Sequence, residues 1–526
     1  MKILSSEAMK ACDRRTIEEY GLPGAVLMET AGARVAEFIR ARLPDLPKVV
    51  VIAGPGNNGG DGLVIARLLS MAGYQVSLWS SVRPGAYRGE AAVFEKYLLK
   101  TSFPLQRLNS SEELQLFKLD LKNADLLVDA LLGTGINREV DGLVADIIEA
   151  VNASNKPVLA VDIPSGINAD SGAVMGNAIR ARWTLTFAFP KLGLMLQPGA
   201  SLAGEVFVGE IFIPEQLAEE AKVELLTPSF IRSLMPPRPS DAHKGNLGRT
   251  MILAGSPGMT GAAVLTAESA LRGGSGLVYL AAPESVCPAL ESKLVEVIVI
   301  PLPESSPGIV SPDAADLVIA GTKECDALAI GPGLDTGAET AELINRLVQL
   351  SPVPMVLDAG ALTALGQNMN MLRSARYIPV VTPHPGEMAR LAGISAKQVQ
   401  SSRLEIALKN ANFWNCNIVL KGANSVIATP DGYAAINPTG SVTLATAGSG
   451  DLLTGLITSF IAQGISPEKA AMAGAYIHGL AGDLLPPGRG HSAGDILLHY
   501  EEAFQRLQTA NLTLPGNPFL SKLRPL

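Results

Sequence analysis

The sequence predicts an α/β protein with two domains, each built on a mostly parallel sheet. At 526 residues, the chain exceeds what a single hydrophobic core usually fills. Short apolar runs typical of buried parallel strands alternate with helical segments in both halves. A proline-rich stretch at 235–240 interrupts the alternation, as a stiff connector would. We therefore expect domains at 1–214 and 241–510, a linker at 215–240 and a C-terminal tail at 511–526.

Composition and charge exclude several classes of function. A formal net charge of −8 argues against a nucleic-acid surface but leaves small anionic ligands open. Cys12, Cys287, Cys325 and Cys416 are too far apart for a C-x-x-C pair, so we expect reduced thiols and no zinc site. The N-terminal residues turn polar too early for a signal peptide, and no uncharged apolar run reaches about 18 residues. We expect a cytoplasmic protein without a membrane partner.

The first domain begins with two predicted helices, which are followed by a strand, a glycine-rich loop and a helix. Ser5 or Ser6 can cap a helix that runs to about Tyr20, and a second helix follows at about 25–43. An apolar strand at 48–53 then leads into a glycine-rich loop at 54–62 and a helix at 63–71. Strand, glycine loop and helix in this order suit an anionic ligand.

The glycine loop does not predict an ordinary dinucleotide site for hydride transfer. Gly54, Gly56 and Gly59 satisfy G-x-G-x-x-G, but the next strand ends in Ser80 and Ser81 instead of the usual acid. The loop also carries Asn57, Asn58 and Asp61, polar groups that a purely structural turn does not need. We therefore predict that this loop binds a ligand.

Polar side chains follow several of the predicted parallel strands. Asp129 ends the strand at 125–129, and Asp162 and Ser165 follow the strand at 157–161. Because ligands of parallel sheets lie beyond the carboxyl ends of the strands, we expect these groups and Asn58 at one sheet edge. Their oxygen atoms could hold a hard cation, a sugar or a phosphate. For each aspartate alone, a loop cap is the alternative.

The first half cannot use histidine for acid–base chemistry. All five histidines lie beyond residue 240. Proton transfer in the first domain must therefore fall to carboxylates, lysine, tyrosine or water. Asp162 and Lys191 are the candidates that the sequence offers, and for Lys191 a solvated surface position remains the alternative.

The second domain repeats the strand, loop and helix order. A strand at 250–254 precedes a glycine-rich loop at 255–261 and a helix at 262–272. Later, Gly448, Ser449 and Gly450 form a predicted turn before a helix that starts at Leu452, with Asp451 at its start. Such a turn suits phosphate, whereas a carboxylate repels it. Asp451 then either holds Mg²⁺ or takes a proton from an attacking hydroxyl, unless it only caps the helix.

Two other segments of the second domain are candidate ligand contacts. Lys421 and its neighbours up to Ser425 lie between two short strands, where they could bind a nucleotide's phosphates or form a surface hairpin. No P-loop motif occurs, which argues against a P-loop NTPase. His384 lies in a proline-bounded turn after a strand, where a ligand contact is more natural than a core position.

Over nearly its whole length the chain resembles the bifunctional NAD(P)H-hydrate repair enzymes. The motifs that carry the resemblance are residues 54–62, Asp129 with 133–135, and 162–166 in the first half, and residues 243–245, 258–262, 382–387, 421–425 and 448–451 in the second. The resemblance implies a Rossmann-like three-layer NAD(P)HX epimerase domain and a ribokinase-like α/β domain that acts as an ADP-dependent (S)-NAD(P)H-hydrate dehydratase. It also implies a homo-oligomer, K⁺ in the epimerase and Mg²⁺ with ADP, or ATP, in the dehydratase.

The resemblance also implies roles for individual residues. The epimerase would bind its substrate through Asn57, Asn58, Gly59, Gly60, Asp61, Gly133, Thr134, Gly135, Ile136, Asn137, Arg138, Glu139 and Asp162, and K⁺ through Asn58, Asp129 and Ser165. The dehydratase would bind the hydrate through Ala262, Gly333, His384 and Asp451, and the adenine nucleotide through Lys421, Gly422, Ala423, Asn424, Ser425 and Gly450. Asp451, Asp162 and Lys191 are the predicted catalytic residues.

Two other functions remain open at this point. A ribokinase-like kinase of a vitamin or sugar would share the Gly-Ser-Gly-Asp turn and the phosphoryl transfer. A nucleotide-binding scaffold with an inactive N-terminal domain would not need Asp162, Asn58 and Asp129.

Overall fold

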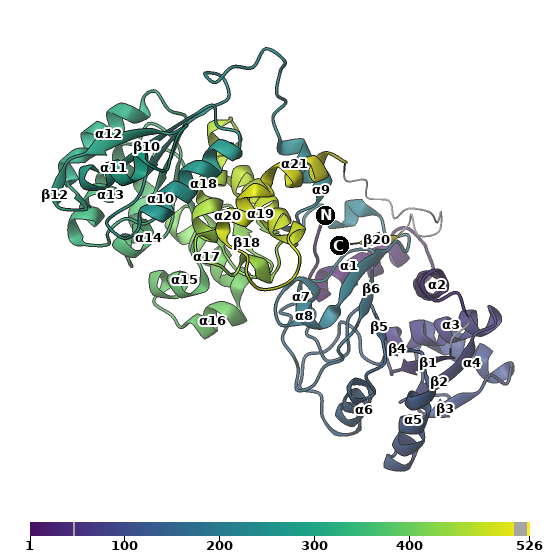
Figure 1. Ribbon diagram of the computed structural model, residues 1–526. Coiled ribbons are helices and arrows are strands. Elements are labelled where there is room, and N and C mark those ends of the chain that lie inside the picture. The colour runs from purple at the N-terminus through teal and green to yellow at the C-terminus, as the bar shows by residue number, and fades with distance from the viewer. Residues whose placement is uncertain (46–47, 510–522, 526) are drawn as a thin grey trace. The chain divides into compact units, whose positions relative to one another are not determined.

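The computed structural model describes residues 1–45, 48–509 and 523–525, which form two compact units. Unit 1 contains Met1–Ala221 and Asn511–Leu526, and unit 2 contains Lys222–Ala510. Each unit has one large sheet flanked by helices (Figure 1). The predicted two-domain α/β architecture is therefore confirmed.

The sheet of unit 1 is parallel except at one edge. Its strand order is β20-β7-β6-β5-β4-β1-β2-β3, and only β20 pairs antiparallel with its neighbour. The strands are β1 (Lys48–Ala53), β2 (Gln75–Ser80), β3 (Leu105–Arg107), β4 (Leu126–Ala130), β5 (Val158–Val161), β6 (Trp183–Phe187), β7 (Glu205–Gly209) and β20 (Leu523–Pro525). The order reverses between β1 and β4, which is where ligands bind in open α/β sheets.

Helices cover both faces of this sheet. They are α1 (Ser6–Glu18), α2 (Gly24–Arg42), α3 (Asn57–Met71), α4 (Gly89–Lys100), α5 (Ser111–Asn123), α6 (Gly142–Ala153), α7 (Leu192–Met195) and α8 (Gly199–Ala203), with a 3-10 turn η1 (Glu215–Ala218). Val49 and Val51 of β1 join a core with α1 to α4, whereas Val50 and Ile52 join a second core with α5 and α6. Alternate residues of one strand thus face opposite layers, which makes the unit a three-layer sandwich.

The sheet of unit 2 is larger and mixed. Its order is β11-β10-β9-β14-β15-β16-β17-β18-β19-β8, parallel from β11 to β17, with β18 antiparallel to both neighbours. The strands are β8 (Val223–Leu225), β9 (Arg249–Leu253), β10 (Leu277–Pro283), β11 (Ile298–Leu302), β14 (Ala327–Ile330), β15 (Met355–Leu357), β16 (Val380–Val381), β17 (Asn417–Leu420), β18 (Val426–Ala428) and β19 (Ala434–Ile436), and β12 (Glu304–Ser306) and β13 (Ile309–Val310) form a separate hairpin. The order reverses between β9 and β14.

The helices of unit 2 also pack on both sides of its sheet. They are α9 (Pro228–Leu234), α10 (Thr260–Arg272), α11 (Cys287–Glu291), α12 (Ala315–Thr322), α13 (Ala338–Leu350), α14 (Gly360–Leu365), α15 (Pro385–Ala392), α16 (Ala396–Ser401), α17 (Arg403–Trp414), α18 (Ser449–Ala462), α19 (Pro467–Leu484), α20 (Ala493–Leu498) and α21 (Tyr500–Thr509). The 3-10 turns are η2 (Glu284–Val286), η3 (Pro312–Ala314), η4 (Met369–Ser374) and η5 (Val442–Leu444). Helices α18 and α19 fill the main core of the unit and are buried along most of their length.

Three helices begin earlier than the sequence predicts. Helix α3 begins at Asn57 instead of residue 63, α10 begins at Thr260 instead of 262, and α18 begins at Ser449 instead of 452. Glycine disfavours helix by about 1 kcal/mol relative to alanine, so local propensity argued for loops. In α3, close packing of Gly59 against the backbone of Gly54 admits only a residue without a side chain, and in α18 Gly450 packs in the same way against the side chain of Lys421.

The structure also divides the chain differently from the predicted boundaries. The residues predicted as a linker, 215–240, include η1 of unit 1 and β8 and α9 of unit 2. Strand β8 pairs with β19 and therefore extends the sheet of unit 2. Of the predicted tail at 511–526, residues 511–522 and 526 lie outside the described residues, while β20 pairs with β7 in unit 1.

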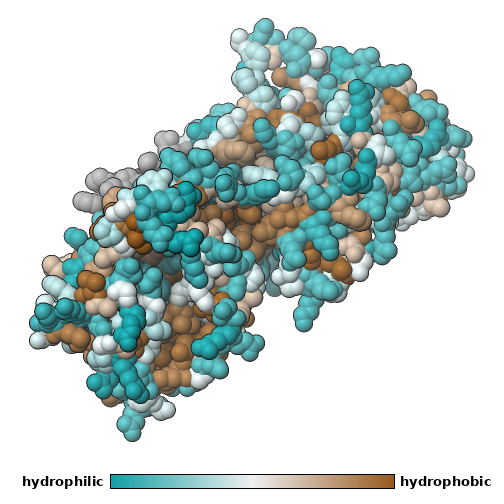
Figure 2. All heavy atoms as spheres, turned by 180° about the vertical axis from the view of Figure 1, so that it is seen from behind, coloured by the Kyte–Doolittle hydropathy of each residue, from teal (hydrophilic) through white to brown (hydrophobic). Residues whose placement is uncertain are grey.

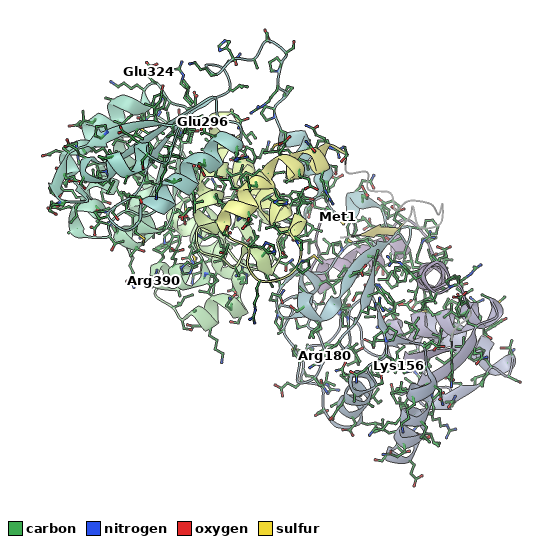
Figure 3. The ribbon with its side chains drawn as sticks, viewed as in Figure 1. Met1, Lys156, Arg180, Glu296, Glu324 and Arg390 are labelled. Carbon is green, nitrogen blue, oxygen red and sulfur yellow. The ribbon has the colours of Figure 1, made fainter. Side chains whose placement is uncertain are left out.

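The surface of both units is mostly polar. Hydrophilic residues dominate the face in Figure 2, and hydrophobic residues gather there in smaller patches. Glu296, Glu324 and Arg390 are exposed charged residues of unit 2 whose positions are labelled in Figure 3. None of the helices within the described residues has both the length and the apolar character needed to cross a bilayer.

Two glycines bring the ends of β1 and β4 together. A Cβ atom on Gly54 would lie 1.6 Å from the carbonyl oxygen of Leu131, which follows β4. A Cβ on Gly59 would lie 1.8 Å from the carbonyl oxygen of Gly54. The absence of side chains therefore lets the first turn of α3 approach the sheet edge where the strand order reverses.

The substitution Gly59→Ala should destabilise unit 1 by about 2 kcal/mol or more, because the added methyl group must displace the backbone of β1. Gly56→Ala is the matched control, since a Cβ on Gly56 meets no atom within 4 Å. Urea unfolding followed by Trp79 and Trp183 fluorescence, in a Trp414→Phe background, measures both variants in unit 1 alone. Equal stability of the two variants would contradict this account of the packing.

Candidate functional sites

A cavity of about 780 Å³ lies at the reversal point of the sheet in unit 1. Its walls come from α1, from the segment after β1 that begins α3, and from the long segment after β4. Asp162, which follows β5, and Lys191, which precedes α7, lie at its base. A cavity of this size accommodates a ligand of small-molecule class.

Most residues that the resemblance assigns to substrate binding line this cavity. They are Asn57, Asn58, Asp61, Gly133, Thr134, Gly135, Ile136, Asn137, Arg138, Glu139 and Asp162. Gly59 and Gly60 instead pack against neighbouring atoms: Gly59 meets the backbone of Gly54 and Gly60 meets the side chain of Met28. These two glycines shape the wall without contributing side chains to it.

Asp162 and Lys191 form a buried ion pair. The Nζ atom of Lys191 donates to Asp162 Oδ1 at 2.5 Å, to Thr186 Oγ1 at 3.0 Å and to the Phe187 carbonyl at 3.1 Å. Only 1% of the Lys191 side chain is exposed, so it is not the surface lysine that the sequence left open. Thr186 Oγ1 also donates to Asp162 Oδ1 at 2.9 Å, which fixes one carboxylate oxygen.

Two further carboxyl groups share this lysine. Burial raises the pKa of Asp13 to about 6, with Lys191 opposing the shift and Asp162 adding to it. Burial also raises the pKa of Asp61 well above its usual value, and the charges of Asp162 and Asp13 add to that shift. One ammonium group therefore faces three carboxyl groups in a poorly solvated space, where burial and mutual repulsion raise the pKa values of Asp13 and Asp61.

Asn58, Asp129 and Ser165 meet behind the cavity wall. Ser165 donates to Asp129 through both its hydroxyl, at 2.6 Å, and its amide, at 2.8 Å. Burial raises the pKa of Asp129 to about 6, although these hydrogen bonds oppose the shift. Asn58 donates through Nδ2 to the Leu132 carbonyl at 2.9 Å, while its buried Oδ1 atom has no hydrogen-bond partner within the described residues.

This oxygen cluster fits a hard monovalent cation. A buried amide oxygen without a donor is costly, and a cation would satisfy it. The carboxylate of Asp129, the hydroxyl of Ser165 and the carbonyl of Leu132 supply the further oxygen atoms that such ions prefer.

In unit 2, Asp451 lies in the first turn of α18. The residue at the N-cap position is Gly448, and no side chain caps the helix. Asp451 therefore does not have the capping role that the sequence left open. Burial raises its pKa to about 6, the charge of Asp358 adds to the shift, Lys421 opposes it, and Glu387 adds to it.

Lys421 links the other charged groups of this site. Its Nζ atom donates to Asp358 Oδ1 at 2.9 Å, and Thr454 of α18 donates to Asp358 Oδ2 at 2.8 Å. A Cβ atom on Gly450 would lie 3.2 Å from Lys421 Nζ, so the glycine permits the close approach of α18. Burial lowers the pKa of Lys421, but the charges of Asp358 and Glu387 outweigh burial and raise it overall.

The remaining predicted residues of unit 2 lie at the same ends of its strands. Gly333 follows β14, and a Cβ atom there would lie 3.1 Å from the Cβ of Ala262 in α10. His384 is the N-cap of α15 and accepts from the amides of Gly386 and Glu387 at 3.0 and 3.3 Å. The segment Lys421 to Ser425 connects the antiparallel strands β17 and β18. It is thus a hairpin whose lysine turns inward.

A buried hydrogen-bond chain supports the start of α18. His478 pairs through Nε2 with Ser449 Oγ at 2.9 Å and through Nδ1 with the Tyr500 hydroxyl at 3.1 Å. Burial, together with the positive charge of Lys421, lowers the pKa of His478 to about 4. The imidazole is therefore neutral at physiological pH and holds the helix end in place.

Sequence reasoning did not identify Asp13, Asp358 or Glu387 as site residues. Asp13 lies four residues from both Met9 and Ile17, so it is a carboxylate on the apolar stripe of a helix. Asp358 directly follows β15, and Glu387 is the capping-box residue of α15. These signals are present in the sequence, but each also fits an ordinary structural role.

Comparisons with known proteins match both units. Residues 24–193 match the family model described as the YjeF-related protein N-terminus, and residues 250–502 match the model described as NAD(P)H-hydrate dehydratase. The bifunctional NAD(P)H-hydrate repair enzyme of Moorella thermoacetica is 44% identical over 505 residues, which span 94% of this chain and 95% of that protein. The enzyme of the same name from Escherichia coli K12 is 33% identical, over 90% of this chain and 87% of its own.

A solved structure is similar to part of this chain. It is an ADP/ATP-dependent NAD(P)H-hydrate dehydratase from Bacillus subtilis co-crystallised with ATP and Mg²⁺. The two share 30% sequence identity with a TM-score of 0.46, and the match covers 54% of this chain and 99% of that chain.

The raised pKa of Asp451 predicts a pH-dependent stability. Because its folded pKa of about 6 exceeds the usual 3.8, the folded state binds more protons between these values and loses stability as pH rises through them. Asp451→Asn should therefore stabilise unit 2 at pH 7.5 by about 2 kcal/mol and have no effect below about pH 4.

Urea unfolding followed by Trp414 fluorescence, with Trp79 and Trp183 replaced by phenylalanine, measures this difference. Asp431→Asn is the matched control, because a hydrogen bond from Thr429 lowers the pKa of Asp431 and its loss should not stabilise the protein. A pH-independent effect of Asp451→Asn would contradict the assigned environment.

Proposed function

The chain belongs to the family of bifunctional NAD(P)H-hydrate repair enzymes, and we propose that unit 1 epimerises NAD(P)HX while unit 2 dehydrates its S epimer to NAD(P)H with ADP, or ATP, as phosphate donor. The observation that best supports two activities is that each unit has its own cluster of carboxyl groups around one buried lysine. A simple vitamin or sugar kinase would have no use for the cluster in unit 1.

In unit 2, Asp451 would act as the base of phosphoryl transfer. The substrate carries a hydroxyl on the ring carbon next to the ring nitrogen, and hydroxide leaves poorly. Asp451 would take the hydroxyl proton while the oxygen attacks phosphorus, and the ring nitrogen would then expel phosphate with formation of a C=N bond. Loss of a proton from the neighbouring ring carbon would then give NAD(P)H. A base with a pKa of about 6 is largely ionised at neutral pH and remains basic enough to accept the proton.

The N-terminus of α18 and the Lys421 side chain would bind the phosphate groups of the nucleotide. The N-terminus of α18 offers the amide group of Gly450, and the Lys421 ammonium lies beside this residue. Helix N-termini and lysine both bind phosphate groups. We further propose that the segment Lys421 to Ser425 contacts the adenine nucleotide and that Ala262, Gly333 and His384 contact the hydrate.

Mg²⁺ would be held mainly by the nucleotide. Within the described residues no three histidine, cysteine or acidic side chains form a metal-binding group. This suits Mg²⁺, which protein sites often hold through one or two carboxylates plus substrate phosphates. When bound, the ion supplies charge neutralisation for the transferred phosphoryl group. With Asp451 serving as the base, Glu387 is the carboxylate that could contact it.

In unit 1, Asp162 and Lys191 would act on the same ring carbon. Epimerisation requires that its C–O bond opens on one face and forms again on the other. The Asp162 oxygen that does not bind Lys191 could exchange a proton with the hydroxyl, while Lys191 holds the carboxylate in place. The nucleotide would contact the cavity walls at Asn57 to Asp61 and Gly133 to Glu139.

We propose that Asn58, Asp129 and Ser165 hold K⁺. A bound cation would neutralise Asp129 and fix the segments that follow β4 and β5, both of which line the cavity or its base. Cytoplasmic location and assembly into a homo-oligomer stay predictions from the sequence and the resemblance.

Asp451→Asn should reduce the dehydration of S-NADHX with ADP by a factor of about 10² to 10⁴, the usual contribution of a general base. The readout is recovery of absorbance at about 340 nm, where reduced nicotinamide absorbs. The disappearance of the R epimer, measured by chromatography, should keep its wild-type rate. Loss of both activities would contradict two separate sites.

Asp162→Asn should reduce R-epimer conversion to near its spontaneous rate while S-NADHX dehydration stays unchanged. Asparagine keeps the shape and can still accept from Thr186, so the fold of unit 1 should survive. Urea unfolding through Trp79 and Trp183 verifies this. Wild-type R conversion by a folded variant would remove Asp162 from the reaction.

A further inference from the structure

One face of α1 forms a wall of the cavity in unit 1. Met9, Asp13 and Ile17, and beside them Lys10, Arg14 and Glu18, line the cavity. Both sets follow the spacing of four residues that places side chains on one face of a helix. The amino-terminal helix thus contributes to the site although it lies more than a hundred residues away from Asp162 in sequence.

The start of α1 is attached to the backbone around Lys191. The amide of Leu4 donates to the Pro190 carbonyl at 3.0 Å, and the Leu192 amide donates to the Leu4 carbonyl at 3.3 Å. These two bonds make a parallel bridge between Leu4 and Lys191. Ser5 then caps α1 by accepting from the Ala8 amide at 3.2 Å. The position of α1 relative to Lys191 is therefore fixed by hydrogen bonds at Leu4, just before the helix begins.

Asp13 is the acidic residue that α1 directs at Asp162 and Lys191. Its carboxyl group interacts with the charges of both. Asp61 of α3 faces it from the other helix, and Lys10 and Arg14 are the basic residues of its own helix that line the cavity. Within the described residues, no hydrogen bond or ion pair to the Asp13 carboxylate is formed, so its oxygens remain available to a ligand.

The reaction needs two proton transfers at one carbon. The departing oxygen takes the C–O electron pair and one proton and leaves as water, while the lone pair of the ring nitrogen forms a C=N bond. Water then adds to the opposite face of that carbon, the C=N electrons return to nitrogen, and the added water gives up one proton. One proton is donated and one is accepted, so nothing is oxidised, and two groups on different sides of the ring suit the task.

We propose that Asp13 is the second catalytic carboxyl of unit 1, exchanging a proton with the oxygen on the side of the ring that faces α1, while Asp162 serves the side that faces the sheet edge. This inference rests on the epimerase activity proposed above. It gives α1 a chemical role, because a ring bound between the helix and the sheet edge would have one carboxyl group on each side.

The test compares Asp13→Asn, Asp13→Glu and Glu7→Gln in the full-length chain. R-NADHX is supplied with ADP, so that unit 2 converts each S molecule formed and absorbance at about 340 nm reports epimerisation. Asp13→Asn should lower kcat about 10²-fold with KM changed less than about threefold. The wild type should show a limb of its kcat profile near pH 6, and Asp13→Asn should abolish it.

Asp13→Glu keeps an ionisable carboxyl group and should restore most of the rate with a displaced pH limb. Glu7→Gln makes the same charge change on an exposed residue of α1 outside the cavity and should behave as wild type. Urea unfolding followed by Trp79 and Trp183 fluorescence verifies that unit 1 of each variant is folded. The rate of S-NADHX dehydration verifies that unit 2, which produces the absorbance signal, is still active.

Two results would overturn the proposal: an Asp13→Asn rate within about threefold of wild type, or a lower rate that keeps the wild-type pH limb and that Asp13→Glu does not restore. The second result would assign Asp13 a purely structural role. A wild-type chain that fails to convert the R epimer faster than the spontaneous reaction would instead reject the proposed epimerase function itself.

Discussion

Each unit surrounds one buried ammonium group with more carboxyl groups than it can neutralise. Lys191 faces Asp162, Asp13 and Asp61, and Lys421 faces Asp358, Glu387 and Asp451. In a poorly solvated site, a carboxyl group that is not paired with the lysine holds its proton more tightly. The pKa values of Asp13 and Asp451 are raised to about 6, and the pKa of Asp61 is also raised. Carboxyl groups with such pKa values can transfer protons near neutral pH. Their ionisation in the folded state lowers the free energy of unfolding.

Both clusters lie beyond the carboxyl ends of parallel strands. Asp162 and Lys191 follow β5 and β6 in unit 1, and Asp358 and Lys421 follow β15 and β17 in unit 2. Gly54 and Gly59 let α3 begin against the strand ends of unit 1, and Gly450 lets α18 begin against Lys421 in unit 2. Residues without side chains therefore place helix N-termini and acidic groups within reach of one ligand.

The two units hold their bases in different ways. In unit 1 the Asp162 carboxylate is fixed directly by Lys191 and Thr186. In unit 2, Asp451 has a freer carboxylate, and what is fixed is its helix, through the chain from Ser449 to His478 and Tyr500. His478 is buried and its pKa is lowered, so the imidazole is neutral and holds the helix end in place.

The sequence by itself determined the α/β class, the presence of two domains, the family and the candidate residues that follow strands. These features could be predicted because the spacing of apolar residues and the motifs at strand ends involve only residues close together in the chain. It also excluded histidine chemistry in the first half. Only the tertiary structure decided where α3 and α18 begin, since packing against Gly54 and Lys421 overrides the low helix propensity of glycine. It alone brought Asp13 to Lys191, because a pKa depends on charges and burial contributed by residues far away in sequence.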